Sequence, residues 1–200
     1  NGSGVDMRHS DTNTVPVGWP WITDCIISGN NRAGSFGGGI FVGGSENATC
    51  SPLIERTTIS DNHANYGGGI GVRLYSAPLI HECTIEGNRA KYDGGGAYFG
   101  DHFTAVLAGC DLSSNVATSG GGGIATASDA YSSRLTLDGC ILGGNEALGY
   151  SGGALFADDA TLDKVREKLD AKLQKMIEAG GFKLLAWGDG GKNRGFSATK

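Results

Sequence analysis

Cysteine and histidine are the residue types in this 200-residue chain that could bind a metal or carry out thiol chemistry. The four histidines show no HExxH or other ligand spacing, and none of the five cysteines forms a CxxC pair. The sequence therefore predicts no metal site and no cofactor. The histidines are His9, His63, His81 and His102, and the cysteines are Cys25, Cys50, Cys83, Cys110 and Cys140.

Four of the cysteines, all except Cys50, recur two residues before an Ile or Leu in phrases such as CTIEGN and CDLSSN. This alternation predicts thiols that point inward and stack in successive copies of the phrase. Neighbouring copies would place two Cα atoms about 4.8 Å apart, within the range of a disulfide, so a bond such as Cys83 to Cys110 stays an alternative. Cys50 lies outside these phrases, in the loop before Ser51, and is predicted to be the most reactive thiol.

A polysaccharide lyase or hydrolase needs carboxylates gathered on one outer face, either to hold calcium or to act as acid and base. Aligned copies of the phrase do not place acids at the same outward position in successive copies. The sequence therefore predicts no catalytic residue and favours a protein that is not an enzyme. One outward column contains Glu55, His81, Ala108 and Asp138, and another contains Ile26, Thr58, Thr84, Asp111 and Ile141.

The elements that must position these residues repeat along the chain. Five copies of a phrase begin with Cys or Thr, carry Ile or Leu two places later and end in Asn, and a glycine run follows each copy. Successive asparagines are 32, 26, 27 and 30 residues apart, so loops must absorb the differences in length. Self-similarity at such a period indicates a solenoid. The asparagines are Asn30, Asn62, Asn88, Asn115 and Asn145.

Within each copy apolar and polar residues alternate, which is the pattern of a strand with one buried face. Helical spacing is absent through residue 157, so strands of successive copies would stack in parallel around one core. We therefore predict an all-β fold, a parallel β-helix of about five coils. An asparagine at each corner would pass amide hydrogen bonds between coils, and glycine bends would leave room where a Cβ would clash. The repeated phrase is interpreted as carrying shape rather than chemistry.

The stretches SPLIERTTISDNHANYGGGI (51–70) and APLIHECTIEGNRAKYDGGGA (77–97) closely resemble the Asn and GGA[ILV]-type repeats of polymorphic outer membrane proteins. They also resemble repeats of bacterial secreted β-helix proteins in the pectate-lyase-like superfamily, over about residues 20–157. This resemblance implies a right-handed coil and an extracellular or cell-surface setting. It does not specify function, because that superfamily holds lyases, hydrolases, epimerases, adhesins and scaffolds.

An apolar outer column is expected directly after the glycine bends, where alternation turns aromatic and aliphatic side chains toward solvent. Nearby loops add arginine and further aromatic residues, which are enriched at interfaces. A protein partner, a second copy of the chain or a surface glycan would cover such a surface. The predicted binding residues are Phe41, Tyr98, Leu155, Arg73, Tyr75 and Phe103.

The composition changes near residue 158, with one lysine before that point and seven after it. The stretch DDATLDKVREKLDAKLQKMIEAGG (158–181) has apolar residues at spacings of three and four, which predicts a capped amphipathic helix. We therefore divide the chain into 1–157, a β-helix with an N-terminal lead-in, and 158–200. The second segment is predicted to cap the open end of the solenoid, to dock to another subunit, or to be an appended piece.

A formal net charge of -5 without a long basic run argues against a nucleic-acid partner. No apolar run approaches the roughly 18 residues of a transmembrane helix. We predict a non-catalytic extracellular or cell-surface scaffold that binds or assembles through its outer face and loops. The alternatives are a polysaccharide-active, pectate-lyase-like enzyme and a small structural subunit docked by its C-terminal tail.

Overall fold

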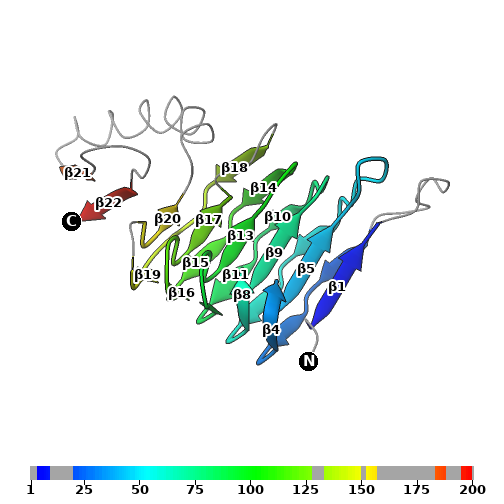
Figure 1. Ribbon diagram of the computed structural model, residues 1–200, viewed down its shortest axis with the longest axis horizontal. Coiled ribbons are helices and arrows are strands. Elements are labelled where there is room, and N and C mark those ends of the chain that lie inside the picture. The colour runs from blue at the N-terminus through cyan, green and yellow to red at the C-terminus, as the bar shows by residue number, and fades with distance from the viewer. Residues whose placement is uncertain are drawn as a thin grey trace.

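The computed structural model describes residues 4–9, 20–127, 133–149 and 152–156, together with the backbone of two strands within 183–199. In this part of the chain the backbone winds as a solenoid of parallel strands, which stack along its long axis (Figure 1). No helix occurs among these residues. The predicted all-β parallel β-helix is thus confirmed, and the predicted helix at 158–181 lies outside the described residues.

Each coil contributes strands to four parallel sheets, and successive coils add neighbouring strands to each sheet. Sheet A contains β1 (Val5–Arg8), β5 (Ile40–Gly43), β9 (Ile70–Arg73), β13 (Ala97–Phe99), β17 (Ile124–Thr126) and β20 (Leu155–Phe156). Sheet B contains β2 (Trp21–Thr23), β6 (Leu53–Glu55), β10 (Leu79–His81), β14 (Thr104–Ala108) and β18 (Arg134–Asp138).

The other two parallel sheets follow sheet B in each coil. Sheet C contains β3 (Ile26–Ser28), β7 (Thr58–Ser60), β11 (Thr84–Glu86) and β15 (Asp111–Ser113). Sheet D contains β4 (Asn31–Phe36), β8 (His63–Tyr66), β12 (Arg89–Ala90), β16 (Val116–Ala117) and β19 (Glu146–Ala147). A separate antiparallel pair is formed by β21 (Lys183–Trp187) and β22 (Gly195–Thr199).

Four coils of the described chain therefore have a strand in every parallel sheet. In a fifth coil Ile141 makes only an isolated bridge to Asp111 at the place of the sheet C strand. At the other end β1 adds a further strand to sheet A, with Val5 beside Ile40 and Met7 beside Val42. The regular stacking thus begins before residue 20, within the segment that the sequence pattern predicts to be a lead-in.

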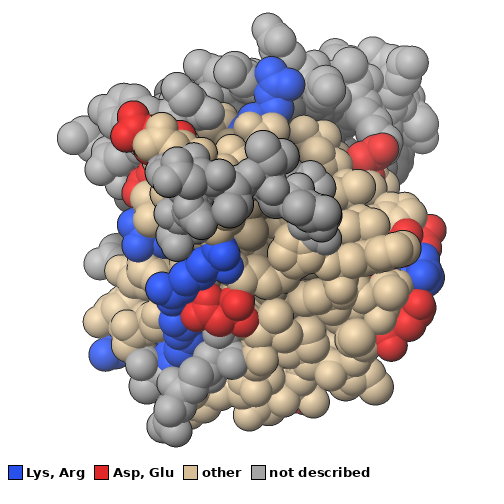
Figure 2. Space-filling model, turned by 90° about the vertical axis from the view of Figure 1, so that its right-hand side faces the viewer, with Lys and Arg blue, Asp and Glu red and all other residues tan. Residues whose placement is uncertain are grey.

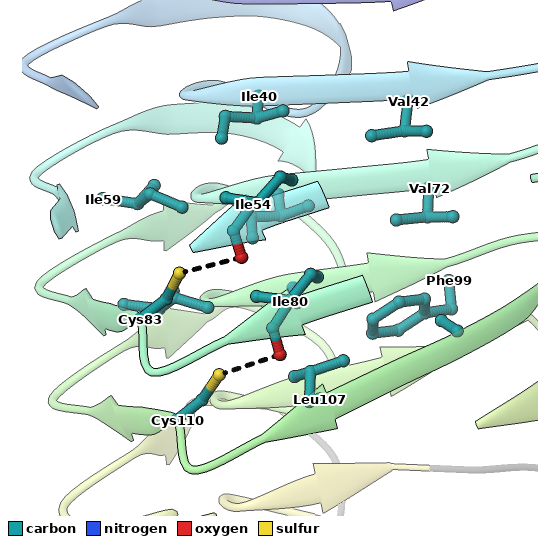
Figure 3. Packing of buried hydrophobic residues seen from close by; sticks show 14 of the residues in the cluster. Ile40, Val42, Ile54, Ile59, Val72, Ile80, Cys83, Phe99, Leu107 and Cys110 are labelled. Atoms are coloured by element: carbon teal, nitrogen blue, oxygen red, sulfur yellow. Dashed lines mark hydrogen bonds between the residues drawn. The ribbon is translucent and has the colours of Figure 1, made fainter. Parts of the chain in front are cut away.

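The core consists of columns in which the same inward position of each coil carries an aliphatic or aromatic side chain. Figure 3 shows Ile54, Ile80 and Leu107 in one such column, and Val42, Val72 and Phe99 in another. All six side chains have no exposed surface. Burial of each contributes about 1.5 to 3 kcal/mol, so the stacked columns supply the main driving force for folding.

The five asparagines of the repeat form a hydrogen-bonded ladder at the corner between sheets C and D. Asn62 donates from its backbone N–H and from Nδ2 to the side-chain oxygen of Asn88, at 3.0 and 3.1 Å. Its Nδ2 also donates to the carbonyl oxygen of Ile27 in the preceding coil at 2.9 Å. The same pattern recurs at Asn88 and Asn115, so each of these buried amides joins three coils.

Three thiols of the predicted cysteine column, those of Cys83, Cys110 and Cys140, are stacked in successive coils. They form no disulfide, because all five cysteines are free. Cys83 donates to the carbonyl oxygen of Ile54 at 3.5 Å, and Cys110 donates to that of Ile80 at 3.4 Å (Figure 3). Both residues are buried. Cys25 is exposed instead, because β2 and β3, the strands around it, are the edge strands of their sheets.

Candidate functional site

The outward positions of sheet A line up along the axis of the solenoid. The strand register places Phe41 beside Gly71, and Gly71 beside Tyr98, so Phe41 and Tyr98 belong to one outward row as the sequence predicts. Leu155 does not belong to this row. It lies beside Ile124 and packs against the core, while Phe156 takes the outward place beside Ala125.

The register of the last coil explains this correction. Ile124 donates its N–H to the carbonyl oxygen of Ala154, just as Ala97 donates to that of Gly123. Ala154 therefore stands where the earlier coils have their third glycine, and the first inward residue of the strand is Leu155. Placing Leu155 in the outward row amounts to aligning Ala154 with Ile124. That alignment is shifted by one residue, so it exchanges the inward and outward positions of the strand.

Four aromatic rings gather on the outer surface where sheet D turns into sheet A, and we call Phe36, Tyr66, Tyr92 and Tyr98 the aromatic patch. The ring of Tyr66 lies 5.0 Å from those of Phe36 and Tyr98 and 5.1 Å from that of Tyr92, measured between centroids. Tyr92 is exposed, and the other three rings are partly exposed. These separations are typical of stacked and tilted aromatic pairs.

The glycine bends create the space for this patch. Phe36 and Tyr66 directly precede glycine runs, and the residue beside Phe41 and Tyr98 in the outward row is Gly71. A Cβ at Gly71 would lie 2.5 Å from the backbone nitrogen of Gly37, so a side chain is excluded there. Between Phe41 and Tyr98 the outward row therefore presents only main chain. An aromatic residue one or two places before a glycine run is the sequence signal that would have revealed Phe36, Tyr66 and Tyr92.

Arg73 contributes a positive charge to the aromatic patch. Its guanidinium carbon lies 4.3 Å from the centroid of the Phe36 ring, and its Nη2 pairs with Asp101 at 3.3 Å. Burial raises the pKa of Tyr98 to about 12. The phenol of Tyr98 is therefore neutral at physiological pH and available as a hydrogen-bond donor or acceptor beside a cationic group.

Phe41, another predicted binding residue, is covered by neighbouring charged side chains. The guanidinium carbons of Arg8 and Arg32 lie 5.0 and 5.3 Å from its ring centroid, and Asp6 pairs with both arginines. Only 9% of Phe41 is exposed. Figure 2, which views the end of the solenoid that carries β1, shows charged side chains of both signs in contact beside a broad uncharged surface.

The two remaining predicted binding residues have different surroundings. Tyr75 is partly exposed and stacks on His102, with 4.7 Å between the ring centroids. Phe103 is 1% exposed and packs against Phe99 at 5.2 Å, so its predicted place on a loop surface is wrong. Cys50, predicted to be the most reactive thiol, is likewise buried, and burial raises its pKa.

Cys50 and Phe103 are buried for the same reason. Both form parallel bridges with Ser76, so the three residues make one more inward column just before sheet B. The sequence pattern assigns this segment to loops because it precedes the recurring phrase. The coils therefore stack in register before the repeated phrase begins, as well as within it.

Residues 2–165 match a family model described as the right handed beta helix region. The chain belongs to this family. No match was found among curated proteins, and none among solved structures. The family assignment makes the solenoid a right-handed β-helix, in agreement with the resemblance in its repeats.

This right-handed β-helix protein also carries a charged cluster on the outer face of sheet B. Glu55 contacts His81 Nδ1 at 3.2 Å and Arg56 Nη1 at 2.6 Å, and Arg56 donates to both oxygens of Asp24 at 2.9 and 3.0 Å. Hydrogen bonding from Arg56 lowers the pKa of Asp24. The carboxylate of Asp24 is therefore held as a charged partner of Arg56.

The described residues of this β-helix protein contain no group of three or more His, Cys, Asp or Glu side chains arranged to hold a metal ion. Among the same residues, no helix has the length and apolar character needed to cross a bilayer. The outward columns of sheets B and C follow the predicted alignment, with Glu55 beside His81 and Thr58 beside Thr84. The aromatic patch is thus the most distinctive surface that the fold assembles.

Proposed function

We propose that this protein is a non-catalytic extracellular or cell-surface β-helix scaffold that binds or assembles through its outer face. The aromatic patch carries this proposal. Its rings come from three successive coils and lie outside the core columns, and one of them packs against a guanidinium group. Aromatic and arginine side chains contribute most of the binding energy at protein interfaces, and exposed tyrosine rings also stack on sugar rings.

The rigidity of the scaffold supports a binding role. The backbone that carries the rings is hydrogen-bonded to neighbouring coils. The carbonyl oxygen of Tyr66 accepts a bond from Gly37 at 2.9 Å, and Tyr92 is bonded to Asn65 and to Ser119, which lie in the coils on its two sides. A preformed surface loses little conformational entropy when a partner binds. Tyr66 and Tyr92 can therefore act as fixed contact points for a protein partner, a second copy of the chain or a glycan.

The test compares Tyr66→Ala and Tyr92→Ala with Tyr75→Ala, which removes a tyrosine outside the patch. We expect binding to a glycan panel, or self-association measured by sedimentation, to weaken about tenfold in the first two variants. The Tyr75→Ala variant should bind like the wild type. Equal weakening in all three variants would show that the patch is not the contact surface.

A polysaccharide-active enzyme is the second candidate, and the contact of Glu55 with His81 beside Arg56 is the observation that favours it. A carboxylate and an imidazole in contact can share a proton, as acid–base catalysis requires. Purified protein would be incubated with a polyuronate, and unsaturated products or new reducing ends would be measured. Turnover that disappears in Glu55→Gln would replace the scaffold proposal with this one.

The third candidate, a structural subunit docked by residues 158–200, stays a prediction because that segment lies largely outside the described residues. The measurement is the mass in solution with and without this segment. A loss of oligomeric state in an otherwise folded chain would support docking through the tail.

A further inference from the structure

The outer face of sheet D carries an open groove of about 470 Å³, adjacent to the aromatic patch. Asn65 and Lys91 line the groove, and the residues that follow them, Tyr66 and Tyr92, belong to the patch. A volume of this size lies within the range of ligand sites in proteins. The groove and the patch are therefore formed by neighbouring residues of the same coils.

Alternation along the short strands of sheet D produces the groove. One outward row contains His63, Arg89 and Val116, and a second contains Asn65, Lys91, Thr118 and Leu148. The alanines between these rows point inward and are buried, as at Ala90 and Ala117. Between the two rows only main-chain atoms face outward. These atoms form the floor of the groove, and the side chains of the two rows form its walls.

The groove is basic in its middle, at the third coil, which contributes both cationic side chains. Arg89 and Lys91 are exposed, and among the described residues neither forms an ion pair with a carboxylate. The ammonium group of Lys91 lies 5.2 Å from the centroid of the Tyr92 ring. Glu146, which continues the first row beyond Val116, does not line the groove. The positive charge is thus available to an anionic ligand.

The end of the groove at the fifth coil is apolar. Leu148 is 61% exposed there, and Val116 lies half-buried between it and the basic middle. Lys91 and Leu148 are two coils apart, which is about 10 Å at the strand spacing of a sheet. An extended peptide covers this distance in about three residues. Acidic residues followed closely by an apolar residue would therefore match the basic middle and the apolar end of the groove.

We propose that this groove binds an extended acidic peptide segment of a partner protein, with carboxylates at Arg89 and Lys91 and an apolar side chain at Leu148. The proposal rests on the proposed function, because it names the partner of the same outer surface. A polyanionic glycan would satisfy the arginine and the lysine but would leave Leu148 without an apolar contact.

The test measures fluorescence anisotropy with a labelled peptide of repeated Glu-Glu-Gly-Leu units. We expect Arg89→Glu to weaken its binding about tenfold, because the variant replaces an attractive charge with a repulsive one. The matched control is Arg134→Glu, since Arg134 is also an exposed arginine that begins a strand but lies outside the groove. This control should bind like the wild type.

Two further probes separate the parts of the proposal. Leu148→Ser should weaken binding of the Glu-Glu-Gly-Leu peptide about fivefold and leave binding of an all-Glu peptide unchanged. A peptide in which Lys replaces Glu should not bind. Circular dichroism of each variant verifies that the fold is intact.

The proposal is overturned if the wild type does not bind the acidic peptide, or if Arg89→Glu and Arg134→Glu weaken binding equally. Tighter binding of a polyuronate that is lost in Arg89→Glu would also overturn it and would assign the groove to a glycan. None of these results affects the proposed function, which is tested separately by the tyrosine variants and by the polyuronate assay described above.

Discussion

The side-chain oxygen of Asn115 accepts two hydrogen bonds from Asn88, one from the backbone N–H and one from Nδ2, each at 3.0 Å. Asn88 Nδ2 also donates to the carbonyl oxygen of Ile59 at 2.8 Å, and Asn88 has no exposed surface. Replacing Asn88 by Leu would leave buried groups on both neighbouring coils without a partner. We expect Asn88→Leu to lower the free energy of unfolding by about 1 to 3 kcal/mol, measured by urea denaturation.

The control for this prediction is His63→Leu, because His63 directly follows a ladder residue but is exposed. Its replacement should change the free energy of unfolding by less than about 0.5 kcal/mol. Similar losses in the two variants would contradict a stabilising role of the ladder.

The glycine bends should differ from other glycines in their tolerance of a methyl group. A Cβ at Gly95 would lie 2.6 Å from backbone atoms of Val116 and would also meet the carbonyl oxygen of Gly122. We expect Gly95→Ala to lower the free energy of unfolding by about 3 kcal/mol, because two backbones would have to separate. In Gly143→Ala the nearest atom would be 4.0 Å away, so this variant should unfold like the wild type.

The thiols should differ in their rates of alkylation. Cys25 is exposed and should react first, whereas Cys50, Cys83 and Cys110 are buried and should be protected. A hydrogen bond to the Cys110 thiol, together with burial, raises the pKa of Cys140, so that half-buried thiol should react slowly. A short iodoacetamide pulse followed by peptide mass spectrometry measures the order, and labelling in urea should modify all five cysteines. Labelling of Cys83 as fast as that of Cys25 would show that the column is not buried.

An alkaline titration should detect Tyr98 as a tyrosine that ionises at a higher pH than an exposed tyrosine does. Burial raises its pKa from 10.0 to about 12, so the folded state retains this proton more strongly than the unfolded state does. The corresponding stabilisation is present below pH 10 and is lost as the pH rises through 12. The phenolate absorbance of the wild type should therefore include a late step that is smaller in Tyr98→Phe, where Tyr66, whose pKa is also raised, remains. A late step of equal size in both proteins would contradict this assignment.

The architecture could be predicted from the sequence because inward and outward positions recur in each coil. The columns through Ile54 and Thr58 follow from counting residues from the asparagine. The same count gives the wrong face for Leu155, because the glycine run before it has an alanine in place of its third glycine. This replacement shifts the register by one residue. The count also fails at Cys50 and Phe103, because the chain already stacks before the phrase begins.

The binding surface was harder to predict than the fold. Tyr98 follows from alternation, but its contacts with Tyr66 and Phe36 depend on how far side chains lean over the glycine bends, which no period in the sequence specifies. Phe41 shows the opposite effect. Its outward place was predicted, yet two arginines from different strands cover it.

The asparagine ladder has a single polarity, because every rung donates to the side-chain oxygen of the next rung toward the C-terminus. Any two neighbouring coils are therefore joined by the same set of bonds, although the coils differ in length. A duplicated gene segment that encodes one coil would supply a rung compatible with both of its new neighbours. The number of coils can thus change by recombination without any new junction having to evolve.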